Sequence, residues 1–186
     1  KPCQKTTKGP VVKIMMRFLI LVFLVPLLRA KPNVLVIITD DQGWGDIGYH
    51  NPKVYTPNLD RLANESATFT QHYVTPQCTP TRLALLTGRY PGRFGPTGLA
   101  ASNDPVLPHG TLTLASLLKQ NGYRTYLTGK WHLGSQPENG PNHHGFDSSY
   151  GALAGAVGAY NHQYKLPELN HPYGITWHRD HKFIEG

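Results

Sequence analysis

The residues best suited to chemistry begin at Cys78, the only cysteine outside the extreme N-terminus. Thr79 can cap a helix, Pro80 suits its first position, and the apolar residues that follow lead to a stop at Gly88. A thiol just outside a helix N-terminus, with Arg82 one turn further in, lies where a negative group is favoured. A buried free thiol beside a surface arginine is the alternative interpretation.

Two adjacent carboxylates follow a strongly β-forming run. Residues 33–39, Asn-Val-Leu-Val-Ile-Ile-Thr, predict a strand covered on both faces, as in a parallel sheet flanked by helices. Asp40 and Asp41 come directly after it, at the strand end where α/β sheets bind ligands. Their repulsion favours a cation between them, and oxygen ligands suit Ca²⁺ or Mg²⁺. A helix cap with a solvated turn would also explain the pair.

Two cationic side chains follow a strand predicted at residues 123–128. Lys130 and His132 alternate, so in extended chain they project to the same side, within reach of one anion. A plain surface pair is the alternative. His143 and His144 have metal-ligand chemistry, but neighbours in extended chain point to opposite faces, which argues against chelation by both.

These segments together resemble the type I sulfatases. The stretch Cys78-Thr79-Pro80-Thr81-Arg82, continued by Leu-Leu-Thr-Gly, is similar to the motif whose cysteine is oxidised to formylglycine. Residues 122–132 resemble the second motif of the family, and residues 141–151 and 177–180 look most like the arylsulfatase B branch and its bacterial relatives. A phosphatase-type thiolate loop matches poorly, because its cysteine and arginine are further apart.

The resemblance implies a role for each candidate residue. Formylglycine made from Cys78 would be the nucleophile: one hydroxyl of its hydrate attacks sulfur, and loss of the other proton later expels sulfate. Arg82 would polarise this group, Lys130 would bind a sulfate oxygen, and His132 would contact the formylglycine hydroxyl. The implied metal ligands are Asp40, Asp41 and modified Cys78, holding Ca²⁺ or, as the second candidate, Mg²⁺.

The resemblance also implies partners. The substrate would be a sulfated carbohydrate or an aryl sulfate, and a formylglycine-generating enzyme would modify Cys78. Two other functions stay open, a hydrolase of the alkaline-phosphatase-like group acting on phosphodiesters or phosphonates, and a non-catalytic fragment. The further metal ligands and the second Lys and His of the family pattern are not found in residues 150–186. We therefore expect little or no sulfatase activity from the 186-residue chain alone.

The elements that must position these residues alternate along the chain. Helices are predicted at residues 56–64, with Pro57 first, and 111–120, with Thr111 as cap and a buried stripe of leucines at 114, 117 and 118. Another strand is predicted at 67–74, and loops from about residue 150 on. This order predicts an α/β fold with a mixed, mostly parallel sheet flanked by helices. The resemblance implies the alkaline-phosphatase-like sulfatase fold, incomplete at the C-terminus.

The net charge of +7 comes almost entirely from the first 30 residues. They hold six of the 18 Lys and Arg residues and no acid, which leaves 12 basic against 11 acidic residues and argues against a nucleic-acid partner. The apolar run at 18–28 is too short to span a bilayer stably but has the form of a signal-peptide core. A buried element of the fold is the alternative.

The chain accordingly divides into three predicted parts. Residues 1–14 form an upstream extension, 15–30 a signal peptide, and 31–186 the N-terminal portion of a sulfatase catalytic domain. We therefore expect the protein to be secreted, periplasmic or lysosomal, and to have no stable membrane span.

Overall fold

The computed structural model describes residues 31–157 and 176–184, and the chain separates into two units, residues 1–42 and 43–186. The predicted extension and signal peptide lie outside the described residues. In the first unit, residues 31–42 contain no helix or strand. The strand predicted at 33–39 is therefore wrong, and its apolar side chains from Val34 to Ile38 are 43–84% exposed. An apolar, β-branched run forms a strand only when a neighbouring strand supplies hydrogen-bond partners, and no described residue does so here.

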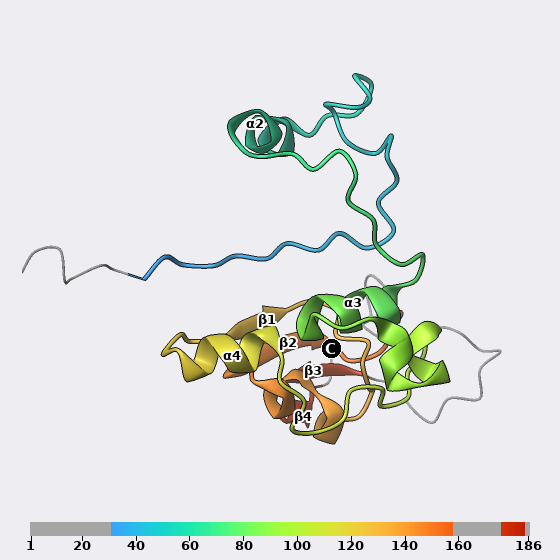
Figure 1. Ribbon diagram of the computed structural model, residues 1–186, viewed down its shortest axis with the longest axis vertical. Coiled ribbons are helices and arrows are strands. Elements are labelled where there is room, and N and C mark those ends of the chain that lie inside the picture. Colours follow the sequence, from blue (N-terminus) through green and yellow to red (C-terminus); the bar gives the residue numbers. More distant parts are fainter. Residues whose placement is uncertain (1–30, 158–175, 185–186) are drawn as a thin grey trace, which may run out of the picture. The chain divides into compact units, whose positions relative to one another are not determined.

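The second unit contains a four-stranded mixed sheet in the order β1-β2-β3-β4 (Figure 1). The strands are β1 (Tyr126–Thr128), β2 (Ser148–Ala152), β3 (Trp177–Arg179) and β4 (Lys182–Phe183). β1 and β2 are parallel, whereas the β2–β3 and β3–β4 pairs are antiparallel. The predicted mixed sheet is thus confirmed, although two of its three described strand pairs are antiparallel and it is not mostly parallel as predicted. The expectation of loops after residue 150 is wrong for β3 and β4, which extend the sheet beyond β2.

Three α-helices are described: α2 (Pro57–Glu65), α3 (Cys78–Thr87) and α4 (Leu114–Gln120). The predicted helix at 56–64 is confirmed, with Pro57 at its first position. Residues 67–74, predicted as a strand, form an exposed loop and turn, because no described strand pairs with them. Short 3₁₀ helices connect the larger elements: η2 (Pro91–Phe94), η3 (Pro96–Leu99), η4 (Pro137–Asn139) and η5 (Pro141–His144).

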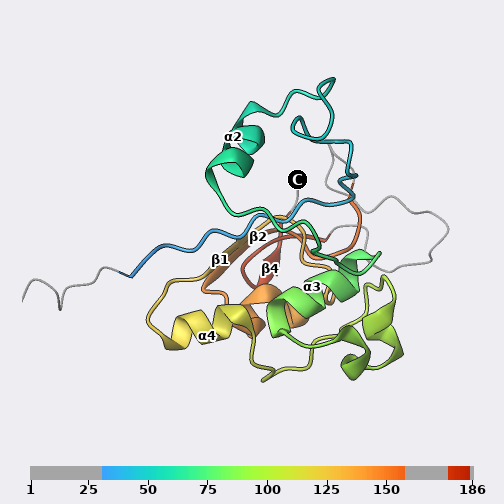
Figure 2. The ribbon, with the colours of Figure 1, turned by 45° about the horizontal axis from the view of Figure 1, so that its top comes forward.

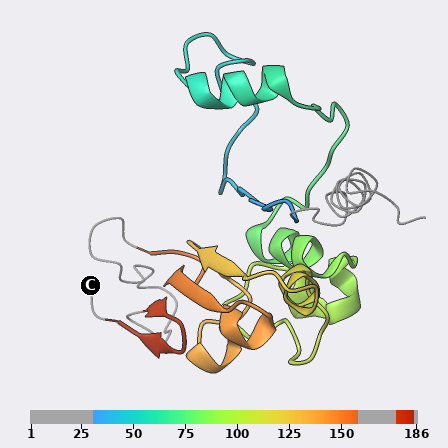
Figure 3. The same cartoon turned by 90° about the vertical axis from the view of Figure 1, so that its left-hand side faces the viewer.

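Helices α3 and α4 are in contact and lie side by side (Figures 1 and 2). Figure 3 shows both of them on the same side of the strands. A core of six buried apolar residues links α3 to the sheet, and its members are Leu83, Val106, Leu107, Trp131, Leu133 and Leu153. Leu83 comes from α3, whereas Trp131 and Leu133 follow β1 and Leu153 follows β2. The helix that begins with Cys78 is therefore fixed by its apolar face against the chain that leaves β1 and β2.

Helix α3 ends as predicted but begins earlier. Gly88 is its C-cap in the left-handed conformation, with φ 65°, and its N–H donates to the Ala84 carbonyl at 2.8 Å. The helix starts at Cys78, so Thr79 and Pro80 lie inside the first turn and are buried. The prediction that Thr79 caps the helix is wrong, because its hydroxyl is used for contacts outside α3.

Helix α4 is capped by Thr113 rather than by Thr111. The Thr113 hydroxyl accepts from the Ser116 N–H at 3.0 Å, and the Ser116 hydroxyl accepts from the Thr113 N–H at 2.8 Å. The Thr113 hydroxyl also donates to the buried His144 carbonyl at 2.7 Å. The capping box places the start of the helix two residues later than predicted, and the contact to His144 ties the cap to η5. The predicted leucine stripe is likewise only partly correct, since Ala115 is buried and Leu117 is 45% exposed.

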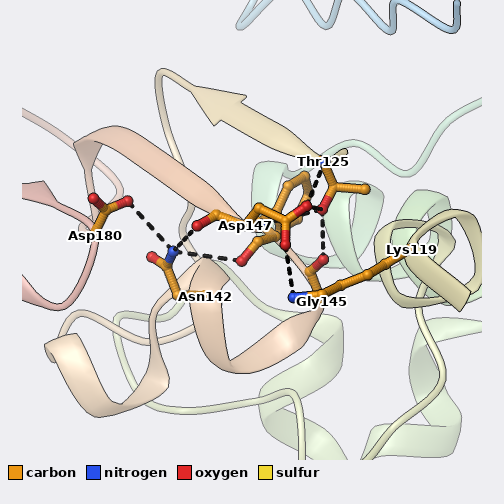
Figure 4. Close-up of polar contacts among 7 residues, drawn as sticks. Lys119, Thr125, Asn142, Gly145, Asp147 and Asp180 are labelled. Atoms are coloured by element: carbon orange, nitrogen blue, oxygen red, sulfur yellow. Dashed lines mark hydrogen bonds and ion pairs between the residues drawn. The ribbon is translucent and has the colours of Figure 1, made fainter. Parts of the chain in front are cut away.

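Two carboxylates organise the polar edge of the sheet (Figure 4). Asp147 forms an ion pair with Lys119 of α4 at 2.7 Å and accepts from the Thr125 N–H at 2.9 Å. The Lys119 ammonium, and after it the Thr125 amide, hold the pKa of Asp147 below its usual range. Asp180, in the β3–β4 turn, accepts from the Ser149 N–H at 2.8 Å, which is the main reason why its pKa is also lowered. These bonds tie α4 and the β3–β4 turn to the chain around β2.

Replacing Thr113 by Val tests the cap of α4. The change keeps the side-chain volume but removes the hydroxyl, leaving the Ser116 N–H and the buried His144 carbonyl without it. We expect a loss of about 1–2 kcal/mol in the free energy of unfolding, measured by urea titration. Thr111→Val is the matched control and should change stability by less than about 0.5 kcal/mol. Equal losses in both variants would contradict the assignment of Thr113 as the cap.

Candidate active site

Helix α3 is bound through side chains to the segment that holds Lys130 and His132. The Arg82 guanidinium, 8% exposed, donates through Nη1 to the Lys130 carbonyl at 2.5 Å. The fully buried Thr79 hydroxyl donates to the His132 carbonyl at 3.2 Å. The two predicted motifs, 48 and 53 residues apart at these contacts, therefore meet in the folded second unit.

Cys78 is the first residue of α3 and is a half-buried free thiol. It is held from both sides, because the Gln77 Oε1 atom accepts from the Ala101 N–H at 2.7 Å and Thr79 makes the contact to residue 132. The backbone around position 78 is thus fixed by the loop at 101–102 and by the end of the β1 segment. An arginine one turn along the same helix adds positive charge near this position.

The chain after β1 does not continue as regular extended backbone. Gly129 and Trp131 donate to the Tyr150 and Ala152 carbonyls at 2.9 and 2.8 Å, and then the very next amide, that of His132, donates to Leu153 at 3.0 Å. His132 has φ 57°, in the left-handed region. The predicted extended run from Lys130 to His132 is therefore wrong at His132, because the strand alternation breaks there. His132 is buried at 5% exposure, whereas Lys130 is half-buried.

Trp131 anchors this segment between the two candidate residues. Its side chain is 1% exposed, and its indole N–H donates to the Asn139 carbonyl at 2.9 Å. The indole stacks on the His144 ring, with centroids 5.6 Å apart, and meets Phe146 edge to face at 6.2 Å. A large, fully buried side chain at position 131 fixes the backbone on both sides of it, and hence the positions from which Lys130 and His132 project.

His143 and His144 lie on the 3₁₀ helix η5 rather than in extended chain. The argument against joint metal chelation, that extended backbone points them to opposite faces, was therefore wrong. His143 is exposed, and its ring faces His109 and His181 with centroids 5.5 and 5.0 Å away. His144 is 2% exposed, and neither ring nitrogen has a hydrogen-bond partner among the described residues. Burial, helped by His109 and His143, lowers the pKa of His144 to about 4. The His144 ring is therefore a neutral, aromatic packing group under Trp131.

Asp40 and Asp41 are exposed and belong to the first unit, whereas Cys78, Lys130 and His132 belong to the second. Asp41 has φ 56°. Within residues 31–157 and 176–184, no group of three or more His, Cys, Asp or Glu side chains could hold a metal ion. Two adjacent carboxylates nevertheless have the donor chemistry that suits Ca²⁺. A cation shared by Asp40, Asp41 and residue 78 stays a prediction.

Three residues of this region were not singled out from the sequence as site residues. Thr79 was expected to cap α3, and Asn103 and Gly155 lie in stretches without a recognisable pattern. Gly155 packs against the imidazole of His132, and its N–H donates to the Asn103 Oδ1 atom at 2.9 Å. Only Thr79 carried a signal, since a hydroxyl beside Cys78 in a helix N-terminus must bond to something when buried.

The chain belongs to the sulfatase family, whose family model matches residues 32–180. It is 39% identical over 165 residues to N-acetylgalactosamine-6-sulfatase of Rattus norvegicus, covering 83% of this chain and 31% of that protein. It is 50% identical over 123 residues to arylsulfatase A of Bos taurus, covering 63% of this chain and 24% of that protein. The predicted family is thus confirmed, and the chain spans less than a third of the length of these relatives.

The solved structures agree. The structure called Ps i-CgsB is 36% identical and superimposes with a TM-score of 0.68, covering 84% of this chain and 38% of that one. Its complex with k-i-k-neocarrahexaose gives a TM-score of 0.64 at 33% identity, covering 79% of this chain and 36% of that one. The predicted alkaline-phosphatase-like sulfatase fold is confirmed by this likeness. None of the helices in the described residues has the length and apolar character needed to cross a membrane.

The buried His144 predicts acid-sensitive stability. Its pKa of about 4 in the folded chain lies below the ordinary value of 6.5, so between these pH values the unfolded chain binds more protons. Stability is therefore highest above pH 6.5 and falls as the pH drops towards 4. The expected loss from this residue is about 2 kcal/mol between pH 7 and pH 5, measured by urea titration at each pH. The pKa values of Asp147 and Asp180 are lowered from their ordinary value of 3.8, so the protonation of these two carboxylates affects stability only at a pH below the interval from 7 to 5.

His144→Phe isolates the effect, because Phe keeps a ring against Trp131 but binds no proton. This variant should lose about 2 kcal/mol less than the unchanged chain over the same pH interval. His143→Gln alters the exposed neighbour and should keep most of the pH dependence, and His178, whose pKa burial also lowers, contributes equally to all three proteins. An unchanged pH slope in His144→Phe would show that His144 is not the group responsible.

Proposed function

We propose that this chain carries the nucleophile and sulfate-binding residues of a sulfuric ester hydrolase that acts on sulfated carbohydrates. Its membership of the sulfatase family supports the reaction class, and the similarity to N-acetylgalactosamine-6-sulfatase supports a sulfated sugar as the substrate class. One observation carries the proposal. Helix α3, which begins at Cys78, is bound by Arg82 to the Lys130 carbonyl and by Thr79 to the His132 carbonyl.

Hydrolysis of a sulfate ester needs an in-line nucleophile, positive charge on the sulfate oxygens and a route for protons. Formylglycine at position 78 would supply an oxygen nucleophile whose hydrate has a second hydroxyl, and that hydroxyl allows sulfate to leave afterwards. A helix N-terminus at position 78 favours negative charge there, so the attacking oxygen and the sulfate are both stabilised.

Arg82, Lys130 and His132 have separate proposed roles. Arg82 keeps its guanidinium buried one turn from position 78, and by donating to the Lys130 carbonyl it fixes the two motifs relative to each other. Lys130 is half-buried, so its ammonium can bind a non-bridging sulfate oxygen while its stem is packed. His132, buried on the same segment, would orient or accept the proton of the hydroxyl at position 78.

Asp40 and Asp41 are the proposed carboxylate ligands of a divalent cation, and Ca²⁺ is favoured over Mg²⁺ because it tolerates irregular oxygen ligand sets. Such an ion would add positive charge beside the sulfate. We also propose that residues 15–30 direct the protein out of the cytosol to a secreted, periplasmic or lysosomal location, where sulfated glycans are met.

Mass spectrometry of the peptide that contains Cys78 tests the nucleophile. When the chain is coexpressed with a formylglycine-generating enzyme, the mass of this peptide should fall by roughly 18 Da relative to the thiol form, because an aldehyde oxygen replaces the sulfur and two hydrogens are lost. Chain produced without that enzyme is the control, and Cys78→Ala should show no such change. A thiol that persists despite active modifying enzyme would contradict the proposed nucleophile and favour a non-catalytic protein.

Paired ester substrates test the reaction class. The purified 186-residue chain with formylglycine should turn over an aryl sulfate slowly or not at all, because the described residues hold no complete metal ligand set. Any turnover should be faster on the sulfate than on the matching phosphate ester. Fast sulfate hydrolysis would refute the need for further ligands, and a preference for the phosphate would favour the phosphodiesterase alternative.

A further inference from the structure

The left-handed backbone conformation of His132 is not explained by its residue type or by its neighbours in the sequence. A residue other than glycine with φ near 57° pays a backbone cost and persists only where its surroundings fix it. Its N–H donates to the Leu153 carbonyl at 3.0 Å, and its carbonyl accepts from the Thr79 hydroxyl at 3.2 Å. The two peptide groups that flank this residue are thus held from different elements, one from the end of β2 and one from α3.

The Thr79 hydroxyl is a junction of three segments. It is fully buried, and besides its contact to His132 it accepts from the Ser102 N–H at 3.2 Å. The Ser102 carbonyl is slightly further away, at 3.4 Å. Since a hydroxyl has one hydrogen, donation to the nearer His132 carbonyl and acceptance from Ser102 satisfy it best. This side chain therefore connects the residue after Cys78 directly to the backbone of His132.

The imidazole of His132 packs against Gly155. A Cβ atom at position 155 would overlap the Nε2 and Cε1 atoms of the ring, so only glycine allows this close approach. The Gly155 N–H donates to the Asn103 Oδ1 atom at 2.9 Å, and the Asn103 carbonyl accepts from the Ser135 N–H at 3.0 Å. The loop at 102–103 thus reaches Thr79, Gly155 and the residues just after His132.

We propose that Thr79 and Gly155 are positioning residues that set where the imidazole of His132 lies relative to position 78. Thr79 fixes the backbone of His132 from the helix that carries the nucleophile, and Gly155 leaves the space into which the ring packs. The inference deepens the proposed function and rests on it for the catalytic role of His132. The claim that Thr79 and Gly155 set the position of the His132 ring can be tested without measuring enzyme activity.

Threonine variants of the whole chain test this proposal by NMR of the histidine rings. The 186-residue protein is labelled with ¹⁵N-histidine, and the ring signals of His132 are assigned by their loss in His132→Gln. Thr79→Val keeps the side-chain volume and removes the hydroxyl, so the ring signals of His132 should shift. Thr79→Ser restores the hydroxyl and should return these signals to their original positions. Thr81→Val is the matched control, because its hydroxyl bonds to Thr75 instead, and it should leave them unchanged.

Gly155→Ala provides an independent test if Thr79→Val fails to fold, as judged by its thermal unfolding curve. The added methyl group should shift the same ring signals, while the signals of the exposed His72 and of the half-buried His50, which stacks on Trp44, should stay in place. Unshifted His132 signals in folded Thr79→Val, or in folded Gly155→Ala, would overturn the proposal. Failure of the proposed function alone would appear differently, as an unmodified Cys78 peptide alongside the expected ring shifts.

Discussion

The hydrogen bond from Arg82 to the Lys130 carbonyl is the contact on which the rest of the candidate site depends. A guanidinium that is 8% exposed must find acceptors inside the protein, because burying it without them would be costly. It finds one in the backbone of the second motif, and the contact is short, at 2.5 Å. The next residue along each segment, Leu83 and Trp131, belongs to the same buried apolar cluster. Charge and apolar packing therefore constrain the same two segments.

The contacts of α3 to the carbonyls of Lys130 and His132 explain why the chain leaves the sheet at His132. The hydrogen-bond ladder between β1 and β2 continues past Thr128 through the amides of Gly129 and Trp131. Its alternation ends at His132, whose amide, the very next one, also donates to this segment. Trp131 enters the core and His132 turns back towards α3. The sheet thus supplies rigidity up to one residue before the proposed catalytic histidine, and side chains from other segments supply the remainder.

The sequence predicted those features that local chemistry decides. The start of α2 follows from Pro57, and the end of α3 follows from Gly88, since both residues favour one backbone conformation without help from distant parts of the chain. The joint occurrence of Cys78, Arg82, Lys130 and His132 also indicated the family correctly. Their roles were taken from resemblance, and spacing along the chain could not reveal that a threonine and a glycine hold the histidine.

Predictions failed where structure depends on a partner. Residues 33–39 and 67–74 have the composition of strands, but a strand is a property of a pair, and no described segment pairs with either. At α4 a local pattern was missed, because Thr113 and Ser116 form a capping box, and a contact from Thr113 to His144, 31 residues away, adds to it. The left-handed backbone of His132 is a further case, since its cause lies in α3 and at the end of β2.

The distance along the chain between Arg82 and its acceptor has a consequence for biosynthesis. Lys130 is synthesised 48 residues after Arg82. At a translation rate of roughly 5–20 residues per second, several seconds pass before the guanidinium of Arg82 can donate to the Lys130 carbonyl. During that interval the start of α3 lacks its contacts to the backbone of residues 130 and 132. The thiol of Cys78, half-buried in the folded chain, is therefore less confined in the nascent chain until residues 130 and 132 have been made and have docked.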